Sequence, residues 1–274
     1  MKIFRAGSPA LACAAILVAQ GLYAQDKVTV PLSNASQPAT VKVHLMHGSI
    51  TVTGGASGQV VVESSKAAGR NEKRQPRDVP PGMKRIDIGR GGMDIVEDHN
   101  VVTISTGSPN AGSNIVVQVP TNASLQLKTL NGGNIEVTGV NGEIEVDDLN
   151  GAISLKNVSG SVLAHSLNGS VTAVLDRVTP DKPMSFTSLN GKIDVTLPGD
   201  TKARVRLKTD NGAVYSDFDV KIEVDANKPV VEDNRGQGGK YRIKVDRSVY
   251  GSINGGGPEY RFETMNGNIF IHKK

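Results

Sequence analysis

Short runs in which hydrophobic and polar residues alternate follow one another along the second half of the chain. In Glu143–Val146 and in Lys192–Val195, every second residue is Ile or Val. Such alternation is typical of a β-strand that is buried on one side only. A corner that contains Asn-Gly precedes most of these runs, and both residue types tolerate a positive φ. The corners are Asn131-Gly132, Asn141-Gly142, Asn150-Gly151, Asn168-Gly169, Asn190-Gly191, Asn211-Gly212 and Asn266-Gly267.

The corners recur at a nearly constant interval, which indicates a repeat architecture. With the variant corner Ser159-Gly160 included, the corners from Asn131 to Asn168 are nine or ten residues apart, and corners preceded by Leu alternate with corners preceded by Val. The repeat is therefore two strands long, 18 or 19 residues, and it lengthens to steps of 22 and 21 residues at Asn190 and Asn211. This pattern predicts an all-β fold, a single-stack β-solenoid with two strands per coil of about 18–22 residues.

One side of each predicted strand faces a narrow aliphatic interior. Each buried Ile, Val or Leu side chain contributes about 1.5 to 3 kcal/mol, which must offset the cost of ordering the backbone. One coil cannot meet that cost alone, whereas a stack can, and Asn side chains stacked at the corners would hydrogen-bond along it. We assign to the interior Ile135, Val137, Ile144, Val146, Ile153, Leu155, Val162, Val171, Ile193 and Val195.

An antiparallel meander is the alternative interpretation, because Asn-Gly between two alternating runs is also a strong signal for a β-hairpin. Two features favour the coil. The links between the predicted strands are very short, and a simple meander does not require the alternation of Leu and Val corners.

The first 24 residues are typical of a secretory signal. Lys2 and Arg5 precede an apolar stretch over residues 10–18, and Ala24 ends a plausible cleavage site. The single cysteine, Cys13, lies within this segment. We therefore expect residues 25–274 to form one exported domain without a thiol, located in the periplasm or at the bacterial cell surface.

Two segments interrupt the repeat. Residues 66–85 contain three Pro, two Gly and seven basic residues against two acidic ones, which predicts a mobile loop of charge +5. The loop is either a solvated insertion or a contact for an anionic partner such as phospholipid or lipopolysaccharide phosphate. The candidate contacts are Lys66, Arg70, Lys73, Arg74 and Arg77. A second predicted loop, 227–239, is nearly neutral.

The chain resembles the bacterial DUF4097 family, which is described as a family of adhesins. The resemblance covers roughly residues 40–274 and includes Ile115–Pro120 followed by Leu125–Gly132, and Gly191–Pro198 followed by Arg204–Gly212. The ending, Gly255–Ile271, is also similar to the last strands of that family. The resemblance implies a β-solenoid, an extracytoplasmic location and a surface or envelope role, and it supplies no catalytic residues.

The residue types that usually form catalytic or metal sites are not arranged in a recognisable motif. His44 and His47 are three apart on a predicted strand and so face opposite sides, and the remaining histidines are isolated. No Gly-x-Ser-x-Gly motif precedes a helix, and tryptophan is absent. One set of acidic residues could cluster on an outer face, namely Glu136, Glu143, Glu145, Asp147, Asp148 and Asp194.

The sequence therefore favours a non-enzymatic protein without cofactor, metal or catalytic residues. We expect its rigid sheet faces to bind an unknown envelope component or another copy of the chain, with no role in nucleic-acid binding. The alternative is a polysaccharide-binding or polysaccharide-cleaving β-helix protein that uses the acidic outer face.

Overall fold

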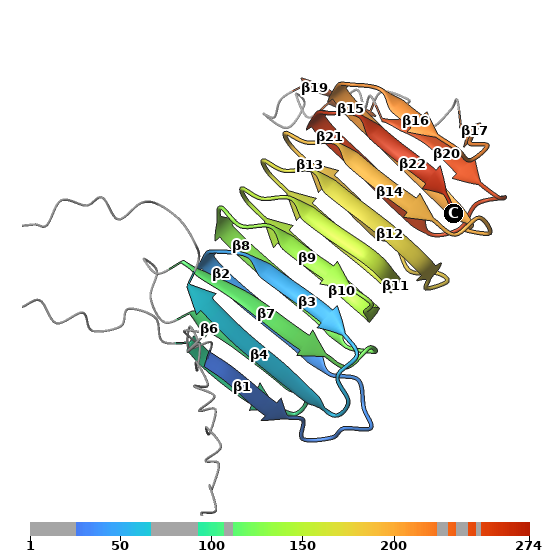
Figure 1. The fold of residues 1–274 in the computed structure, drawn as a ribbon. Helices are drawn as coiled ribbons and strands as arrows, with labels where there is room; N and C mark the ends of the chain where they lie inside the picture. Colours follow the sequence, from blue (N-terminus) through green and yellow to red (C-terminus); the bar gives the residue numbers. More distant parts are fainter. Residues whose placement is uncertain (1–25, 67–92, 107–111, 224–229, 234–240, 245–247) are drawn as a thin grey trace, which may run out of the picture.

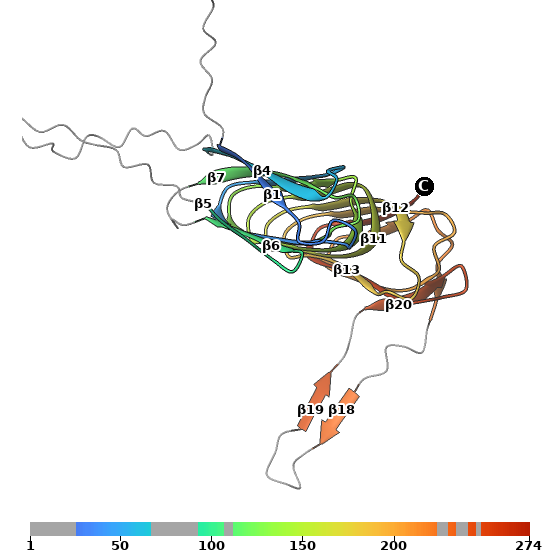
Figure 2. The same cartoon turned by 90° about the horizontal axis from the view of Figure 1, so that it is seen from below.

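The computed structural model describes residues 26–66, 93–106, 112–223, 230–233, 241–244 and 248–274. This part of the chain is all-β, as the alternating pattern predicts, and it contains no helix. Twenty strands form one hydrogen-bonded sheet, which folds into two layers around a core (Figure 1). Figure 2, turned by 90°, shows the flattened outline that the two layers enclose. Within the described ranges, no helix is long and apolar enough to cross a membrane.

Layer A is built mainly from parallel strands. Its strands, in spatial order, are β5 (Met93–Asp98), β6 (Val101–Thr106), β2 (Thr40–His47), β8 (Ser124–Asn131), β10 (Asn141–Asp148), the second half of β11 (Ile153–Ser166), β13 (Met184–Ser188), β21 (Glu259–Asn266), β15 (Ala203–Asn211), β20 (Val249–Ile253) and β17 (Lys221–Ile222). From β6 to β15 every neighbouring pair is parallel, whereas β5, β20 and β17 add antiparallel strands at the two ends.

Layer B follows the same plan. Its spatial order is β1 (Asp26–Pro31), β4 (Gln59–Lys66), β7 (Ser113–Val119), β3 (Ile50–Gly54), β9 (Ile135–Thr138), the first half of β11, β12 (Val171–Val178), β14 (Ile193–Leu197), β22 (Ile269–Lys273) and β16 (Val214–Ser216). Its two antiparallel pairs, β1–β4 and β4–β7, lie at one end, and the other neighbouring pairs are parallel. The antiparallel meander is therefore wrong for residues 124–197, where all pairings between these strands are parallel.

The spatial order differs from the chain order at both ends. We call a layer A strand and the layer B strand that follows it in the chain, such as β8 and β9, a rung. The last rung, β21–β22, lies between rungs β13–β14 and β15–β16, although it comes after both in the chain. Likewise, rung β2–β3 lies between β6–β7 and β8–β9. The sequence pattern had predicted that the corner at Asn211 follows directly after the one at Asn190, and this order is wrong.

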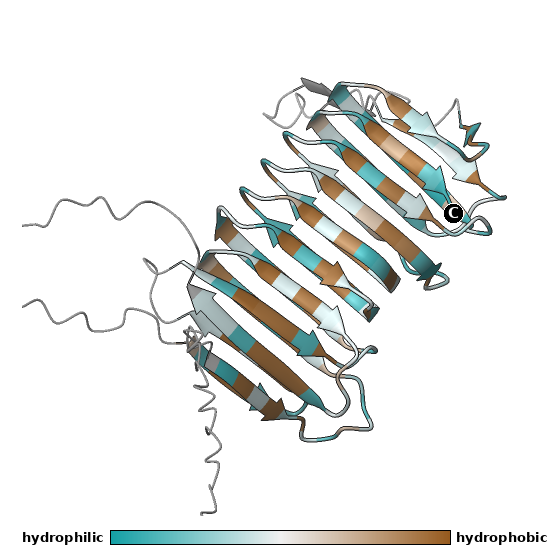
Figure 3. Cartoon of the chain, viewed as in Figure 1, coloured by the Kyte–Doolittle hydropathy of each residue, from teal (hydrophilic) through white to brown (hydrophobic). Residues whose placement is uncertain are grey.

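The interior is a continuous column of aliphatic side chains, and all ten positions assigned to it from the sequence are buried. Figure 3 shows the alternation along most strands that produces this column. The larger residues gather near the C-terminal end, where Phe186 and Phe262 stack with ring centroids 5.4 Å apart. Because side chains alternate along a strand, the same pattern leaves polar residues on the outer surfaces of both layers.

The corner glycines are required mainly by close stacking and not by a positive φ. Among the seven corner glycines, only Gly132 has a positive φ, of 79°. A Cβ at Gly169 would lie 1.9 Å from the carbonyl oxygen of Gly151, and one at Gly191 would lie 2.2 Å from that of Gly169. In the β8–β9 rung the stacked residue is Gly133 instead of Gly132, since a Cβ there would lie 1.8 Å from the Gly48 carbonyl oxygen.

A ladder of asparagine side chains runs beside the glycines. Asn168 donates to Asn150 over 2.8 Å, and Asn190 donates to Asn168 over 2.9 Å. The ladder continues through Asn266, which donates to Asn190 over 2.7 Å, and ends at Asn211, which donates to Asn266 over 2.8 Å. The ladder thus follows the spatial order of the rungs and not the order of the chain.

Several predicted segments lie wholly or partly outside the described residues. The predicted signal at 1–24 does, as does the basic loop except Lys66, which ends β4. The predicted loop at 227–239 contains strand β18 (Val230–Asp233), which pairs with β19 (Tyr241–Lys244) in a separate antiparallel sheet. That strand was missed because the segment lacks the corner-plus-strand pattern.

Candidate interaction surfaces

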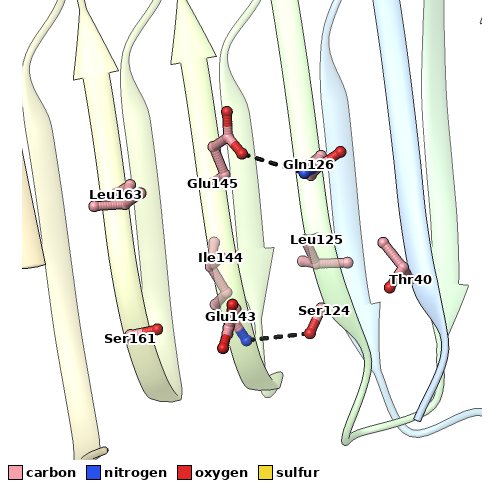
Figure 4. Close-up of a pocket in the computed structure, with 9 residues that line it drawn as sticks. All are labelled: Thr40, Ser124, Leu125, Gln126, Glu143, Ile144, Glu145, Ser161 and Leu163. Carbon is pink, nitrogen blue, oxygen red and sulfur yellow. Dashed lines mark hydrogen bonds between the residues drawn. The ribbon is translucent and has the colours of Figure 1, made fainter. Parts of the chain in front are cut away.

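The outer surface of layer A contains two shallow, open hollows. The first measures about 230 Å³ and lies over β2, β8, β10 and β11, where Gln126, Glu143, Glu145 and Leu163 line it (Figure 4). The second measures about 280 Å³ and lies over β10, β11 and β13, with Glu145 shared between the two. Outward-facing positions of adjacent strands form both, so the hollows follow directly from the alternation along β8, β10 and β11.

The acidic side chains of β10 are tied to neighbouring strands. Gln126 donates to Glu145 over 3.3 Å, and Lys128 Nζ lies 2.9 Å from Asp147 and 3.4 Å from Glu145. The hydrogen bond to Asp147 raises the pKa of Lys128 above its usual value. Lys182 contacts Glu143 at the other end of the strand. These half-exposed pairs neutralise much of the negative charge that the sequence alone suggested for this face.

The six predicted acidic residues do not form one cluster. Glu143, Glu145 and Asp147 lie on layer A, whereas Glu136 and Asp194 lie on layer B. Asp148 points into the interior, where only 2% of it is exposed. Burial raises the pKa of Asp148 to about 6. The expectation of a single acidic face is therefore wrong, because the two strands of one rung belong to opposite layers.

The C-terminal half of layer A is rich in arginine. The Arg204 guanidinium contacts Glu223 at 2.6 Å, and the Arg206 guanidinium contacts Glu263 at 3.3 Å. Both guanidinium groups lie 5.7 Å from the centre of the Tyr250 ring, within the range of a cation–π interaction. This cluster forms because β20 pairs with β15, a pairing that the local sequence pattern did not reveal.

Layer B carries a small stack of rings near its C-terminal end. Tyr215 and Phe270 stack with ring centroids 5.2 Å apart, and the His272 ring lies 6.2 Å from Phe270. His272 Nδ1 lies 2.9 Å from Asp217, and this hydrogen bond lowers the pKa of the Asp217 carboxyl. The aromatic residues had looked scattered in the sequence, and the pairing of β16 with β22 brings these together.

The histidines occupy separate places. His44 faces outward on layer A, and His47 lies at the end of β2 opposite Asn131. His165 contacts the Thr187 hydroxyl at 2.8 Å on layer A. Within the described ranges, no group of three His, Cys, Asp or Glu side chains is arranged to hold a metal ion.

Comparisons with known proteins give one distant structural neighbour. No protein-family model matches the chain, so the resemblance to DUF4097 stays a prediction. No curated protein matches it either. A crystal structure of a putative cell adhesion protein from Clostridium sporogenes aligns with 92% of this chain and 100% of that chain, with 10% identity and a TM-score of 0.41.

Proposed function

We propose that this protein is an exported, non-enzymatic β-solenoid of the DUF4097 type with an adhesin-like or envelope scaffold role. It would bind an envelope component, or another copy of itself, through its rigid sheet faces. The observation that carries this proposal is the continuous parallel register over stacked rungs, from β6 to β15 in layer A and from β7 to β16 in layer B. The equivalent Asn150 and Asn168 are 18 residues apart, and Asn168 and Asn190 are 22 apart, as expected for one coil per step.

The outer faces are also better suited to binding a partner over an extended surface than to catalysis in a pocket. The hollows of layer A are shallow, and Glu143, Glu145 and Asp147 pair with neighbouring cations. A two-layer stack with a continuous aliphatic core resists bending, so its outer side chains keep fixed spacings of about 4.8 Å between strands. Such a surface presents many weak contacts at once, which favours extended partners.

The test is a pull-down from envelope extract of the source bacterium with purified protein. We expect capture of an envelope component, and loss of capture when outward residues are changed at unchanged stability, as in Lys156→Glu on layer B or Lys42→Glu on layer A. Capture that persists in both variants, or no capture by the parent protein, would argue against a role of the sheet faces.

A second candidate is cleavage or binding of polysaccharide, and the hollow that contains Glu143 and Glu145 favours it. Incubation of the purified protein with a panel of acidic polysaccharides tests this function. Cleavage that Glu145→Gln abolishes would replace the scaffold proposal, whereas unchanged polymer length would leave the scaffold as the better account.

Contact of the basic segment 66–85 with anionic lipid is a separate proposal that rests on the charge of the sequence. Salt-sensitive binding to vesicles that contain anionic lipid should disappear when that segment is deleted. Binding that is unchanged by the deletion would end this proposal.

A further inference from the structure

The residues that precede the Asn-Gly corners form an exposed apolar ridge along one edge of layer A. We define the apolar ridge as Met46, Leu130, Leu149, Leu167, Leu189 and Met265. Strand register places them side by side. Leu45 and His47 pair with Thr129 and Asn131, which aligns Met46 with Leu130. Backbone hydrogen bonds such as Leu149 N–H to Thr129 and Leu189 N–H to Ser166 continue the row.

The ridge is unusually exposed for its residue types. Leu130 is 43% exposed, Leu149 39% and Leu189 37%, while Met46 and Met265 at the two ends are 40% and 45% exposed. Leu167 near the centre is half-buried. Six rungs at about 4.8 Å spacing make a continuous apolar strip about 24 Å long. A contiguous strip of this kind, unlike scattered single residues, marks an interaction surface.

The interior does not need these side chains. The positions just before the ridge residues point inward and are mostly polar, as in Thr129, Asp148 and Ser166. The asparagines that follow the ridge residues hydrogen-bond to one another in the ladder, as Asn168 does with Asn150 and Asn190 does with Asn168. The leucines therefore contribute little to the core, and their repetition at successive rungs is better explained by a partner that covers them.

We propose that the partner is a second copy of this chain, joined through the apolar ridge by a two-fold axis that passes beside Leu167. The two stacks then run in opposite directions, so that Leu130 meets Met265 and Leu149 meets Leu189 of the other copy. This inference deepens the proposed scaffold role and rests on it, because it names self-association as one use of the rigid edge.

Charges beside the ridge fit this arrangement. A second row of outward residues runs beside the ridge, two positions before the ridge residue in each layer A strand. In spatial order, its register-paired members are His44, Lys128, Asp147, His165, Thr187, Glu263 and Lys208. His165 is the fourth of the seven residues in this row, and Leu167, beside which the axis passes, is the fourth of the six residues in the ridge. When the two-fold axis runs along the strand direction, the layer A faces of the two copies oppose each other and the two rows lie on the same side of the ridge. This arrangement sets Lys128 of each copy opposite Glu263 of the other, so two opposite-charge contacts would add to the ion pairs that Lys128 makes with Asp147 and Glu145 and that Glu263 makes with Arg206.

The surface area that a stable dimer must bury indicates an interface made of the apolar ridge and this charged row together. A stable dimer usually buries about 800 Å² on each partner, more than six partly exposed side chains offer. The charged row adjoins the ridge over the same rungs and supplies the polar rim that such interfaces have around an apolar centre.

The first test is the oligomeric state of the purified protein by sedimentation velocity over a range of concentrations. We expect a reversible dimer whose dissociation constant rises about a hundredfold in the Leu149→Asn, Leu189→Asn double variant. Val116→Thr is the matched control, because Val116 is 37% exposed on layer B and lies far from the ridge. Circular dichroism and urea unfolding verify that both variants remain folded.

The second test is disulfide cross-linking in a Cys13→Ser background, which removes the only cysteine. Near the two-fold axis, Leu167→Cys should form a disulfide with itself in the other copy. Leu130→Cys alone should not, but a mixture of Leu130→Cys and Met265→Cys proteins should form the mixed dimer.

Three outcomes would overturn the inference. These are a monomer at every concentration, a dimer that the ridge substitutions do not weaken, and efficient cross-linking of Leu130→Cys to itself. A monomer that binds lipid vesicles through the ridge would assign the surface to a membrane instead. Failure here is separate from failure of the proposed function, because a monomer can still capture an envelope component in the pull-down.

Discussion

Asp148 and Ser166 are register partners in the neighbouring parallel strands β10 and β11, but the Ser166 hydroxyl is hydrogen-bonded whereas one of the two Asp148 carboxylate oxygens is buried without a partner among the described residues. The Ser166 hydroxyl donates to the Gly151 carbonyl over 3.1 Å, and Ser188 and Thr264 make the same bond to the carbonyls of Gly169 and Gly191. Asp148 accepts from the Asn150 N–H with Oδ1, while its Oδ2 is buried and has no partner among the described residues.

A protonated Asp148 would restore the pattern, because its O–H could donate to a carbonyl as the serine hydroxyls do. The equivalent carbonyl would be that of Gly133, because a Cβ at Gly151 would lie 2.1 Å from the Gly133 oxygen and 2.4 Å from Asp148 Oδ2, which places both oxygens next to Gly151. Burial raises the pKa of Asp148 from 3.8 to about 6. The folded state therefore binds this proton more tightly than the unfolded state does.

The first prediction is a stability that falls as pH rises from about 4 to above 6. The contribution of the protonated Asp148 is fully present below the unfolded pKa of 3.8 and is lost as pH rises through about 6, a difference of about 3 kcal/mol. Asp148→Asn stays neutral, so it should be more stable than the parent by about 2 kcal/mol at pH 7.5 and similar to it at pH 4. Urea unfolding at several pH values measures this difference.

Asp200→Asn is the control for this experiment, because Asp200 is an exposed carboxylate on a turn. Its stability should follow that of the parent at every pH. The difference in free energy of unfolding between the parent and Asp148→Asn should change between pH 4 and 7.5. A constant difference would contradict the raised pKa of this carboxyl.

The second prediction compares two corner glycines. Gly169→Ala should destabilise the fold by several kcal/mol, because its Cβ would lie 1.9 Å from the backbone oxygen of Gly151 and neighbouring rungs would have to separate. Gly132→Ala meets no atom within 4 Å and has only the strain of a φ of 79°, which costs about 1 kcal/mol. Equal losses in urea unfolding would show that backbone conformation, and not close stacking, selects glycine at the corners.

The third prediction concerns the asparagine ladder. Asn168→Ala removes one hydrogen bond to Asn150 and one from Asn190, each of which contributes about 0.5–1.5 kcal/mol. Asn211 ends the ladder and makes one such bond, to Asn266, so Asn211→Ala should cost about half as much. Thermal unfolding of the two variants measures the difference, and a larger loss for Asn211→Ala would rule out the ladder as the source.

The fourth prediction tests which side of the strands faces the core. Ile153→Asp should cost several kcal/mol, because it places a carboxylate at a position that is 1% exposed. Glu145→Lys should cost less than about 1 kcal/mol, because its contacts to Gln126 and Lys128 are half-exposed. Urea unfolding at pH 7 compares the two, and similar tolerance of both changes would contradict the observed burial.

The period of the repeat was readable from sequence because it depends on local alternation. Ile153 and Leu155 are buried for the same reason that Ser154 between them is not, and this rule requires no knowledge of distant residues. The identity of each strand's neighbour depends on distant pairing instead. Asn190 hydrogen-bonds to Asn266, 76 residues later, and nothing in the spacing of the corners distinguishes that partner from Asn211.

The same limit applies to the candidate surfaces. Glu143 and Asp194 looked equivalent along the chain, yet they lie on opposite layers because each rung contributes one strand to each layer. Tyr215 and Phe270 are far apart in sequence and stack only because β16 pairs with β22. The apolar ridge was visible as repeated leucines, but its exposure could be read only from the structure.

The last prediction tests the insertion of the final rung. Phe262 on β21 is fully buried against Phe186 on β13, and β21 also pairs with β15 on its other side. Phe262→Ala should therefore cost about 3–5 kcal/mol, because it leaves a cavity between rungs that are distant in the chain. Phe270→Ala, in the next strand of the same rung, removes a ring that is only half-buried and should cost clearly less. If the final rung were only a frayed end, both changes would have small and similar effects on urea unfolding. A large loss confined to Phe262→Ala would mean that the last 16 residues, 259–274, join the rungs on either side into one cooperative unit.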